Sequence, residues 1–128
     1  MAMYIFADKI RNEKKLPVFN HGEMQRDFTY IDDIINGIVS SIQKNYNYEI
    51  FNLGNHRKEN LSSLVEYIEN SLGKKAKKNF LALQIGDVPK TFSDIDHARN
   101  KLNYKPENSI KEGIQKFIEW YKLYHKIP

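Results

Sequence analysis

Arg26 and Asp87 are the residues of this sequence whose types and surroundings offer the most for binding chemistry. Arg26 follows a turn at residues 20–22, and its guanidinium could hold a phosphate through two parallel hydrogen bonds. An ion pair with Asp27 or another carboxylate accounts for this arginine equally well. Asp87 lies in a Gly-Asp-Val-Pro loop, where it could accept hydrogen bonds from two ribose hydroxyls, although aspartate more often serves there as a plain turn residue.

Other reactive groups do not form a recognisable set. No glycine-rich loop joins a predicted strand to a helix, and no combination of Ser, Lys and Tyr stands out. The four histidines lack the spacing of metal ligands, and the chain has no cysteine. Asp32 and Asp33 resemble a carboxylate dyad, but capping and dipole compensation at a helix start explain them more simply. The residues alone therefore predict no catalytic centre and no metal site.

The composition predicts a single globular domain over residues 1–128. With 128 residues, 41% of them hydrophobic and 28% charged, the chain has room for one core and little more. Its apolar runs are too short to span a membrane, and its first residues lack the features of a secretory signal. The absence of cysteine fits a reducing compartment. We therefore expect a cytoplasmic protein without a membrane partner.

The basic excess of +4 says little about partners. Lysines gather at Lys74, Lys75, Lys77 and Lys78, just after a predicted helix end, where cations offset the helix dipole. Nucleic-acid binders concentrate such charge on one face and interleave stacking aromatic residues. A solvated basic turn is therefore the preferred interpretation and nucleic acid is not an expected partner, while a stand-alone basic interaction module is kept as an alternative.

Hydrophobic periodicity predicts a mixed α/β (α+β) fold of helices with a few short strands. A helix is expected within residues 2–15, with its helical spacing lost at residues 12–15. Further helices are expected over residues 32–42, 61–72, 93–102 and 109–121, and strands over residues 17–19, 26–31, 49–53 and 79–83. The first two strands are expected to form a hairpin or a paired loop. These strands are too few to close a sheet by themselves.

Helix boundaries are predicted from capping residues. Asp32 is expected as an N-cap, and Gly73 as the left-handed residue that ends the third helix. Capping boxes are expected where Ser93 precedes Asp96 and where Ser109 precedes Glu112. Isoleucines in helical spacing mark one face of the helix that follows Asp32.

The stretch from Asn20 to Ile34 resembles extended short-chain dehydrogenase/reductase enzymes that act on nucleotide sugars, in particular the UDP-glucuronate 4-epimerase group. The likeness continues in Phe-Asn-Leu-Gly-Asn-His-Arg at 51–57, Gly-Asp-Val-Pro at 86–89 and Phe-Ile-Glu-Trp-Tyr at 117–121. It implies the C-terminal substrate-binding part of such an enzyme, with residues 49–53 similar to the last strand of the cofactor-domain sheet. The Rossmann core is absent, and the family's glycine-rich NAD loop, its Tyr-x-x-x-Lys pair and its catalytic Ser or Thr have no counterpart here.

The resemblance implies that five residues hold the substrate. Pro17 and Phe19 fall in the extended piece whose backbone pairs with the uracil edge, and Phe19 would help to hold the base. Arg26 matches the arginine that clamps the diphosphate, and Asp87 matches the carboxylate that binds the ribose hydroxyls. Gln84 falls where relatives often carry a basic residue near the phosphates, and a neutral amide would bind more weakly there.

The activity implied by the resemblance is an NAD-dependent 4-epimerisation that interconverts UDP-glucuronate and UDP-galacturonate. The sugar is oxidised at C4, turns over, and is reduced again on its other face. NAD would belong to the parent enzyme, so this chain alone is expected to be inactive. The implied partners are a UDP-sugar and an N-terminal Rossmann domain, and the oligomeric state is not indicated. Another UDP- or dTDP-sugar epimerase or dehydratase is the alternative within the enzyme class.

Overall fold

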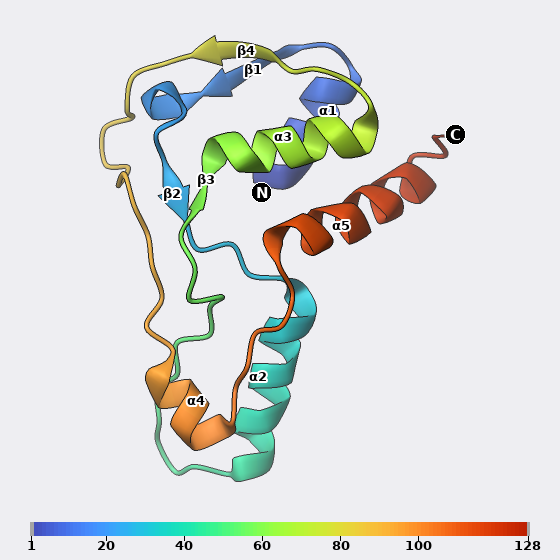
Figure 1. The fold of residues 1–128 in the computed structure, drawn as a ribbon. Helices are drawn as coiled ribbons and strands as arrows, with labels where there is room; N and C mark the ends of the chain where they lie inside the picture. The colour runs from blue at the N-terminus through green and yellow to red at the C-terminus, as the bar shows by residue number, and fades with distance from the viewer. Residues whose placement is uncertain (1, 128) are drawn as a thin grey trace.

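Two groups of elements make up the computed structural model, which describes residues 2–127 (Figure 1). The first group contains helices α1 (Ala2–Arg11), α3 (Leu61–Leu72) and α5 (Ile110–Tyr124), strands β1 (Lys15–Val18) and β4 (Lys77–Phe80), and the 3₁₀ turn η1 (Phe19–Gly22). The second contains α2 (Ile31–Lys44) and α4 (Asp96–Leu102). The short strands β2 (Gln25–Arg26) and β3 (Glu59–Asn60) lie between the two groups.

The strands pair across long stretches of sequence. β1 runs parallel to β4, with Lys15 opposite Lys77, and β2 runs antiparallel to β3. The predicted hairpin between residues 17–19 and 26–31 is therefore wrong, because each of its strands takes a distant partner instead. The predicted strand over residues 49–53 is also wrong: this segment is irregular and joins no sheet of the described chain.

The larger hydrophobic core lies where α1, α3 and α5 pack together and against β1. Its members include the fully buried Ile10, Leu64, Ile68, Ile114 and Tyr121. Each buried side chain of this size contributes about 1.5 to 3 kcal/mol relative to exposure. A smaller core beside α4 consists of Ile95, Ala98, Leu102 and Tyr104. The two cores correspond to the two groups of elements in Figure 1.

Two of the predicted helix ends are confirmed. Ser109 accepts a hydrogen bond from the Glu112 amide at 3.3 Å, and the Glu112 carboxylate accepts one from the Ser109 amide at 2.9 Å. Gly73 ends α3 in the left-handed conformation, with φ +66°. The helix expected within residues 2–15 ends at Arg11, where the helical spacing of the sequence is lost, and Glu13 beyond it adopts a positive φ of 54°.

Two other predicted caps are wrong. The N-cap of α2 is Tyr30, and Asp32 lies inside the first turn. No Ser93 capping box forms, since the N-cap of α4 is Ile95 and the Asp96 amide donates instead to the Asp94 carboxylate at 3.0 Å. In both places the predicted capping residue lies two residues away from the N-cap of the helix.

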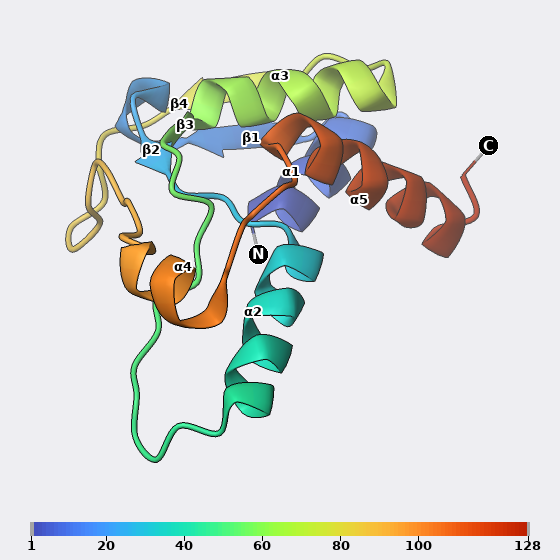
Figure 2. The ribbon, with the colours of Figure 1, turned by 60° about the horizontal axis from the view of Figure 1, so that its bottom comes forward.

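Helix α2 presents its apolar side outward. On the inner side Gly37 is buried, and a Cβ atom there would lie only 2.7 Å from the Leu53 side chain. Asp33 is also buried, and it accepts hydrogen bonds from the amides of Glu107 and Asn108. The outer side carries exposed apolar residues, here called the α2 face: Ile31, Ile35, Ile38, Val39 and Ile42. The views agree that α4 lies on one side of α2, while no other described element covers the opposite side (Figure 1, Figure 2).

The lysine cluster after α3 is paired with carboxylates. Lys74 and Lys77 lie 3.3 and 3.5 Å from Glu13. Lys75 and Lys78 lie 3.3 and 3.4 Å from Glu69, whose side chain is buried. The two glutamates together offset two of the four positive charges of this basic turn.

None of the helices within residues 2–127 has the length and the hydropathy that a membrane span requires.

Glu69 joins the end of α3 to the strand that follows it. Burial by itself would raise the pKa of this glutamate. The hydrogen bond from the Ala76 amide, at 2.9 Å, and the two lysines outweigh burial and lower the pKa of Glu69 below its ordinary value. The ionised form of Glu69 therefore stabilises the folded chain.

Replacing Glu69 with glutamine gives a pH-dependent loss of stability. Because its pKa is lower in the folded chain, Glu69 contributes stability that is present above the ordinary value of 4.5 and lost as the pH falls through the lowered pKa. We expect Glu69→Gln to reduce the free energy of unfolding at neutral pH by about 1 to 2 kcal/mol. The difference from wild type should shrink in acid, as measured by urea unfolding at several pH values.

Glu66→Gln, on the exposed side of the same helix, is the matched control. It should change the free energy of unfolding by no more than about 0.5 kcal/mol. A Glu69→Gln difference that stays constant from neutral to acid pH would contradict the assignment.

Candidate functional site

Strand β2 is the centre of the candidate site, because it holds two other segments together. On one side it pairs with β3. On the other, the Gln25 amide donates to the Pro89 carbonyl at 2.9 Å, and the Thr91 amide donates to the Gln25 carbonyl at 3.1 Å. The loop that carries Asp87 is thereby fixed along the strand that carries Arg26.

The Arg26 guanidinium is held by three hydrogen bonds. One nitrogen, Nη1, donates to the carbonyls of Gln25 and Pro89 at 2.9 and 3.2 Å. The other, Nη2, donates to Asp87 Oδ1 at 2.7 Å. The side chain remains 22% exposed. The ion-pair partner is thus Asp87 rather than the neighbouring Asp27, and the two predicted site residues are in direct contact.

Asp87 closes a tight turn that begins at Gln84. The Asp87 amide donates to the Gln84 carbonyl at 3.1 Å, and Gly86 supplies the positive φ, +86°, that a type II turn needs at its third residue. Asp87 Oδ1 also accepts the amide of Val88 at 3.0 Å. The turn leaves the Gln84 side chain exposed beside the pair.

Pro17 and Phe19 lie one segment away from this loop. Pro17 is in β1, while Phe19, which was expected to be extended, begins η1 and packs against the larger core. The Leu81 amide donates to the Val18 carbonyl at 2.9 Å and so ties the start of the Asp87 loop to them. Of the five predicted residues, Arg26 and Asp87 are in direct contact, and Gln84 begins the turn that Asp87 closes. Pro17 and Phe19 are linked to this loop only through the backbone hydrogen bond between Leu81 and Val18.

Asp27 is the site residue whose role the sequence did not indicate. Its carboxylate accepts hydrogen bonds from three backbone amides: Asn55 at 2.8 Å, His56 at 3.1 Å and Ser93 at 3.1 Å. These amides come from two segments that are distant in the sequence, so no local pattern around Asp27 predicts the contacts. Asp27 therefore binds both segments to the residue that follows Arg26.

Tyr104 is hydrogen-bonded to the segment that Asp27 holds at Asn55 and His56. Its hydroxyl donates to the Gly54 carbonyl at 3.0 Å. Burial, together with the charges of Asp33 and Asp27, raises the pKa of Tyr104 to about 12. The hydroxyl therefore stays protonated and remains a donor. Glycine at position 54 also lets Ser93 pack closely against the backbone there, because a Cβ atom would lie 2.4 Å from the Ser93 side chain.

The described residues do not fit a dinucleotide. Dinucleotide sites place a glycine-rich turn between a strand and a helix, so that the backbone can approach the pyrophosphate. Within residues 2–127, the connections from β2 to α2 and from β3 to α3 contain no glycine. No group of three or more metal-ligating side chains in this part of the chain could hold a metal ion either.

Solved structures share this architecture. UDP-glucuronic acid 4-epimerase from Bacillus cereus, in complex with UDP-glucuronic acid and NAD, has a TM-score of 0.89 and is 32% identical. The match covers 97% of this chain and 40% of that one. The fold is thus that of the C-terminal part of an extended short-chain dehydrogenase/reductase that acts on nucleotide sugars, which confirms the predicted fold class.

The sequence match gives the family. A model described as GDP-mannose 4,6 dehydratase matches residues 3–117, and the chain belongs to this family. A UDP-glucuronate 4-epimerase of Thermodesulfobacterium geofontis is 40% identical over 95% of this chain and 38% of that protein. An uncharacterised protein of Methanocaldococcus jannaschii is 46% identical over 94% of this chain and 37% of that protein. The chain therefore spans about two fifths of the length of these relatives.

Asp27→Ala should destabilise the chain strongly, because three backbone amides lose their acceptor at once. We expect the free energy of unfolding to fall by about 3 kcal/mol. Asp32→Ala, an exposed aspartate on α2, is the control and should cost less than about 1 kcal/mol. Urea unfolding measures both variants, and equal losses would contradict the role given to Asp27.

Proposed function

We propose that this chain holds the UDP portion of the substrate in an NAD-dependent 4-epimerase that interconverts UDP-glucuronate and UDP-galacturonate. Residues 1–128 would form one nucleotide-sugar-binding domain of that enzyme. The observation that carries the proposal is the contact between Arg26 and Asp87, two residues of complementary binding chemistry, at 2.7 Å in an accessible loop site.

Arg26 is prepared to bind a diphosphate. A guanidinium has five N–H donors, and three of those of Arg26 serve to fix its plane. Two donors are left for phosphate oxygens, and the fixed plane reduces the entropy lost when an anion binds. Because Asp87 already offsets the charge of Arg26, we expect the free chain to bind UDP only weakly.

Asp87 is prepared to bind a ribose. Its Oδ1 receives Arg26 and the amide of Val88, so Oδ2 is left to accept a hydroxyl hydrogen bond. One carboxylate would then contact both the arginine of the phosphate site and the sugar next to the phosphate. The segment from Pro17 to Phe19 would hold the uracil, and the neutral Gln84 at the exposed turn would add little to phosphate binding.

Such a site would assist catalysis from a distance. Binding energy from the nucleotide, which does not react, retains the substrate without restricting the sugar as it turns over. The reaction at the sugar C4 would take place in the part of the enzyme that holds NAD. This chain would therefore bind and orient the substrate but show no turnover alone, and we expect the parent enzyme to work in the cytoplasm.

The relatives named above favour a uronic acid sugar over other nucleotide sugars. Another UDP- or dTDP-sugar epimerase or dehydratase is the second candidate, because the proposed contacts involve the nucleotide and not the sugar. The ion pairs argue against a basic interaction module, since Glu13 and Glu69 each hold two of the four lysines within 3.5 Å and offset half of their charge.

Titration with UDP tests the proposed phosphate and ribose contacts. We expect Arg26→Ala to weaken UDP binding about tenfold or more, because charge-assisted hydrogen bonds are lost.

Asp87→Asn should reduce the preference of the chain for UDP over 2′-deoxy-UDP, since the acceptor of the ribose hydroxyl is weakened. Isothermal titration calorimetry or NMR line shifts measure both effects.

Arg99→Ala is the matched control, because Arg99 on α4 is also paired with an aspartate, Asp96, at 3.1 Å. It should leave UDP binding unchanged. If Arg26→Ala and Arg99→Ala bind UDP equally well while both remain folded, the proposed grip on the diphosphate is wrong.

A further inference from the structure

The proposed diphosphate site is short of positive charge. The diphosphate of a nucleotide sugar carries a negative charge on each of its phosphates. Arg26 offers one positive charge, which the Asp87 carboxylate offsets at 2.7 Å. Glu59 lies directly opposite Arg26 in the β2–β3 pair and adds another negative charge, while Gln84 is neutral. A dianion is therefore bound well here only if a further cation is supplied.

The lysines beside β2 lie on the wrong face to supply that cation. Successive side chains of an extended chain point to opposite faces, and paired residues share a face. Lys90 is bridged to Gln25, so it lies on the face opposite to Arg26. Lys58 precedes the β3 partner of Gln25 by two residues, and its Nζ lies 4.8 Å from the centre of the Phe92 ring. Both lysines therefore point away from the guanidinium.

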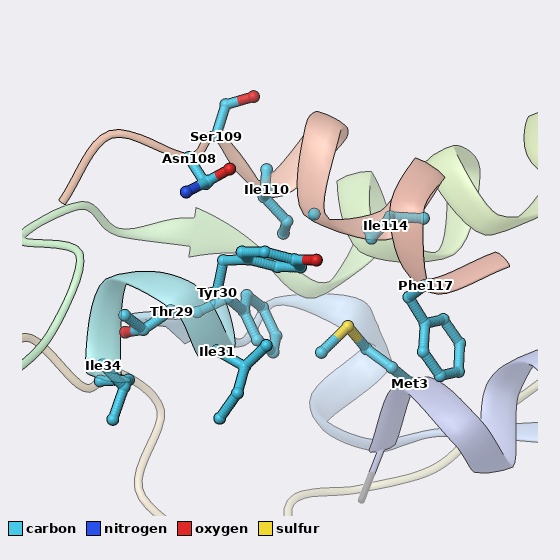
Figure 3. Close-up of a pocket in the computed structure, with 12 residues that line it drawn as sticks. Met3, Thr29, Tyr30, Ile31, Ile34, Asn108, Ser109, Ile110, Ile114 and Phe117 are labelled. Carbon is cyan, nitrogen blue, oxygen red and sulfur yellow. The ribbon is translucent and has the colours of Figure 1, made fainter. Parts of the chain in front are cut away.

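The segment that follows β2 offers no unengaged cation either. It leads into an apolar pocket of about 320 Å³ between α1, the first turn of α2 and α5, and none of the residues that line the pocket carries a charge. Figure 3 shows Tyr30 lying across this pocket below Ile110. The Nζ of Lys116 lies 4.7 Å from the centre of the Tyr30 ring and donates to Asn108 at 2.9 Å.

Arg57 is an exposed cation on the same face as Arg26. It precedes Glu59, the partner of Arg26, by two residues, so the alternation of the chain that enters β3 brings both arginines to one face. Among residues 2–127, the arginines that form ion pairs are Arg26 and Arg99, and Arg57 has no carboxylate partner. Its charge is therefore available to a bound anion.

One hydrogen bond holds the backbones of the two arginines close together. The His56 amide donates to Asp27 Oδ2 at 3.1 Å. Arg57 directly follows the donor residue, and Arg26 directly precedes the acceptor residue. His56 Nδ1 also donates to the Ser93 carbonyl at 2.9 Å, and His56 has the left-handed φ of 56° that residues other than glycine seldom adopt. The chain is thus fixed just before Arg57.

We infer that Arg57 is the second cationic ligand of the diphosphate and supplies the charge that the neutral Gln84 does not. The inference rests on the proposed function, because it concerns the same site. Arg26, whose plane is fixed by its hydrogen bonds, would orient the diphosphate. Arg57, which has no partner to give up, would add the net attraction. The class of ligand that needs this residue is a nucleoside diphosphate rather than a nucleoside.

Titration of this chain with UDP and with uridine, followed by NMR line shifts, tests the inference. We expect Arg57→Ala to weaken UDP binding about fivefold or more, because charge-assisted hydrogen bonds to phosphate are lost. Uridine, which has no phosphate, should bind to this variant as it binds to wild type. Arg57→Lys keeps the charge without the planar fork, so it should restore part of the affinity for UDP.

Lys58→Ala is the matched control, because it removes one positive charge from the neighbouring residue on the opposite face. It should leave UDP binding within about twofold of wild type, since an exposed charge that makes no contact is screened by salt. Equal losses for Arg57→Ala and Lys58→Ala would mean that only net charge matters, and would overturn the inference. A loss for Arg57→Ala that uridine shares would overturn it too.

Arg26→Ala separates this inference from the proposed function on which it rests. If Arg26→Ala weakens UDP binding and Arg57→Ala does not, the proposed site stands and the role given to Arg57 is wrong. If neither variant weakens UDP binding, or if wild type does not bind UDP, the proposed site and the role of Arg57 are both wrong.

Discussion

The carboxylate of Asp27 is the interaction on which the site depends. Three backbone amides from two distant segments converge on its two oxygens. Buried amides without an acceptor are costly, so the segments stay where this carboxylate holds them. Arg26, one residue earlier, is thereby placed on a rigid strand rather than on a mobile loop. The position of the Arg26 backbone therefore depends on the hydrogen bonds of Asp27.

The same arrangement explains how a small pair of strands can hold the candidate site in place. β2 has only two residues, yet it is bonded to β3 on one side and to the loop after Asp87 on the other. Its arginine donates to two carbonyls and a carboxylate, so the guanidinium is oriented before any ligand arrives. Preorganisation of this kind lowers the entropic cost of binding.

Local features were predicted in part from the sequence, since the caps expected at Asp32 and Ser93 are wrong, and the long-range pairings were not predicted. The capping box at Ser109 and the left-handed Gly73 depend on residues within one helical turn, and both are confirmed. The strand pairings depend on partners far along the chain, so the expected hairpin and the strand at 49–53 are wrong.

The candidate site was predictable only in part, for the same reason. Arg26 and Asp87 were singled out by residue type and by resemblance, but their contact was not foreseen because it joins distant segments. The isoleucines of α2 predicted a helix correctly. Their outward direction could not be read from periodicity, which marks a face without saying what covers it.

The parallel pairing of β1 with β4 has a consequence for synthesis of the chain. Lys15 lies opposite Lys77, so β1 has no partner strand until residues 77–80 have been synthesised. α1 must wait still longer for the complete core, because α5 follows β4 in the chain. Distant contacts of this kind form slowly. During this interval the apolar side chains of Phe6 and Ile10 lack the partners that bury them in the finished core.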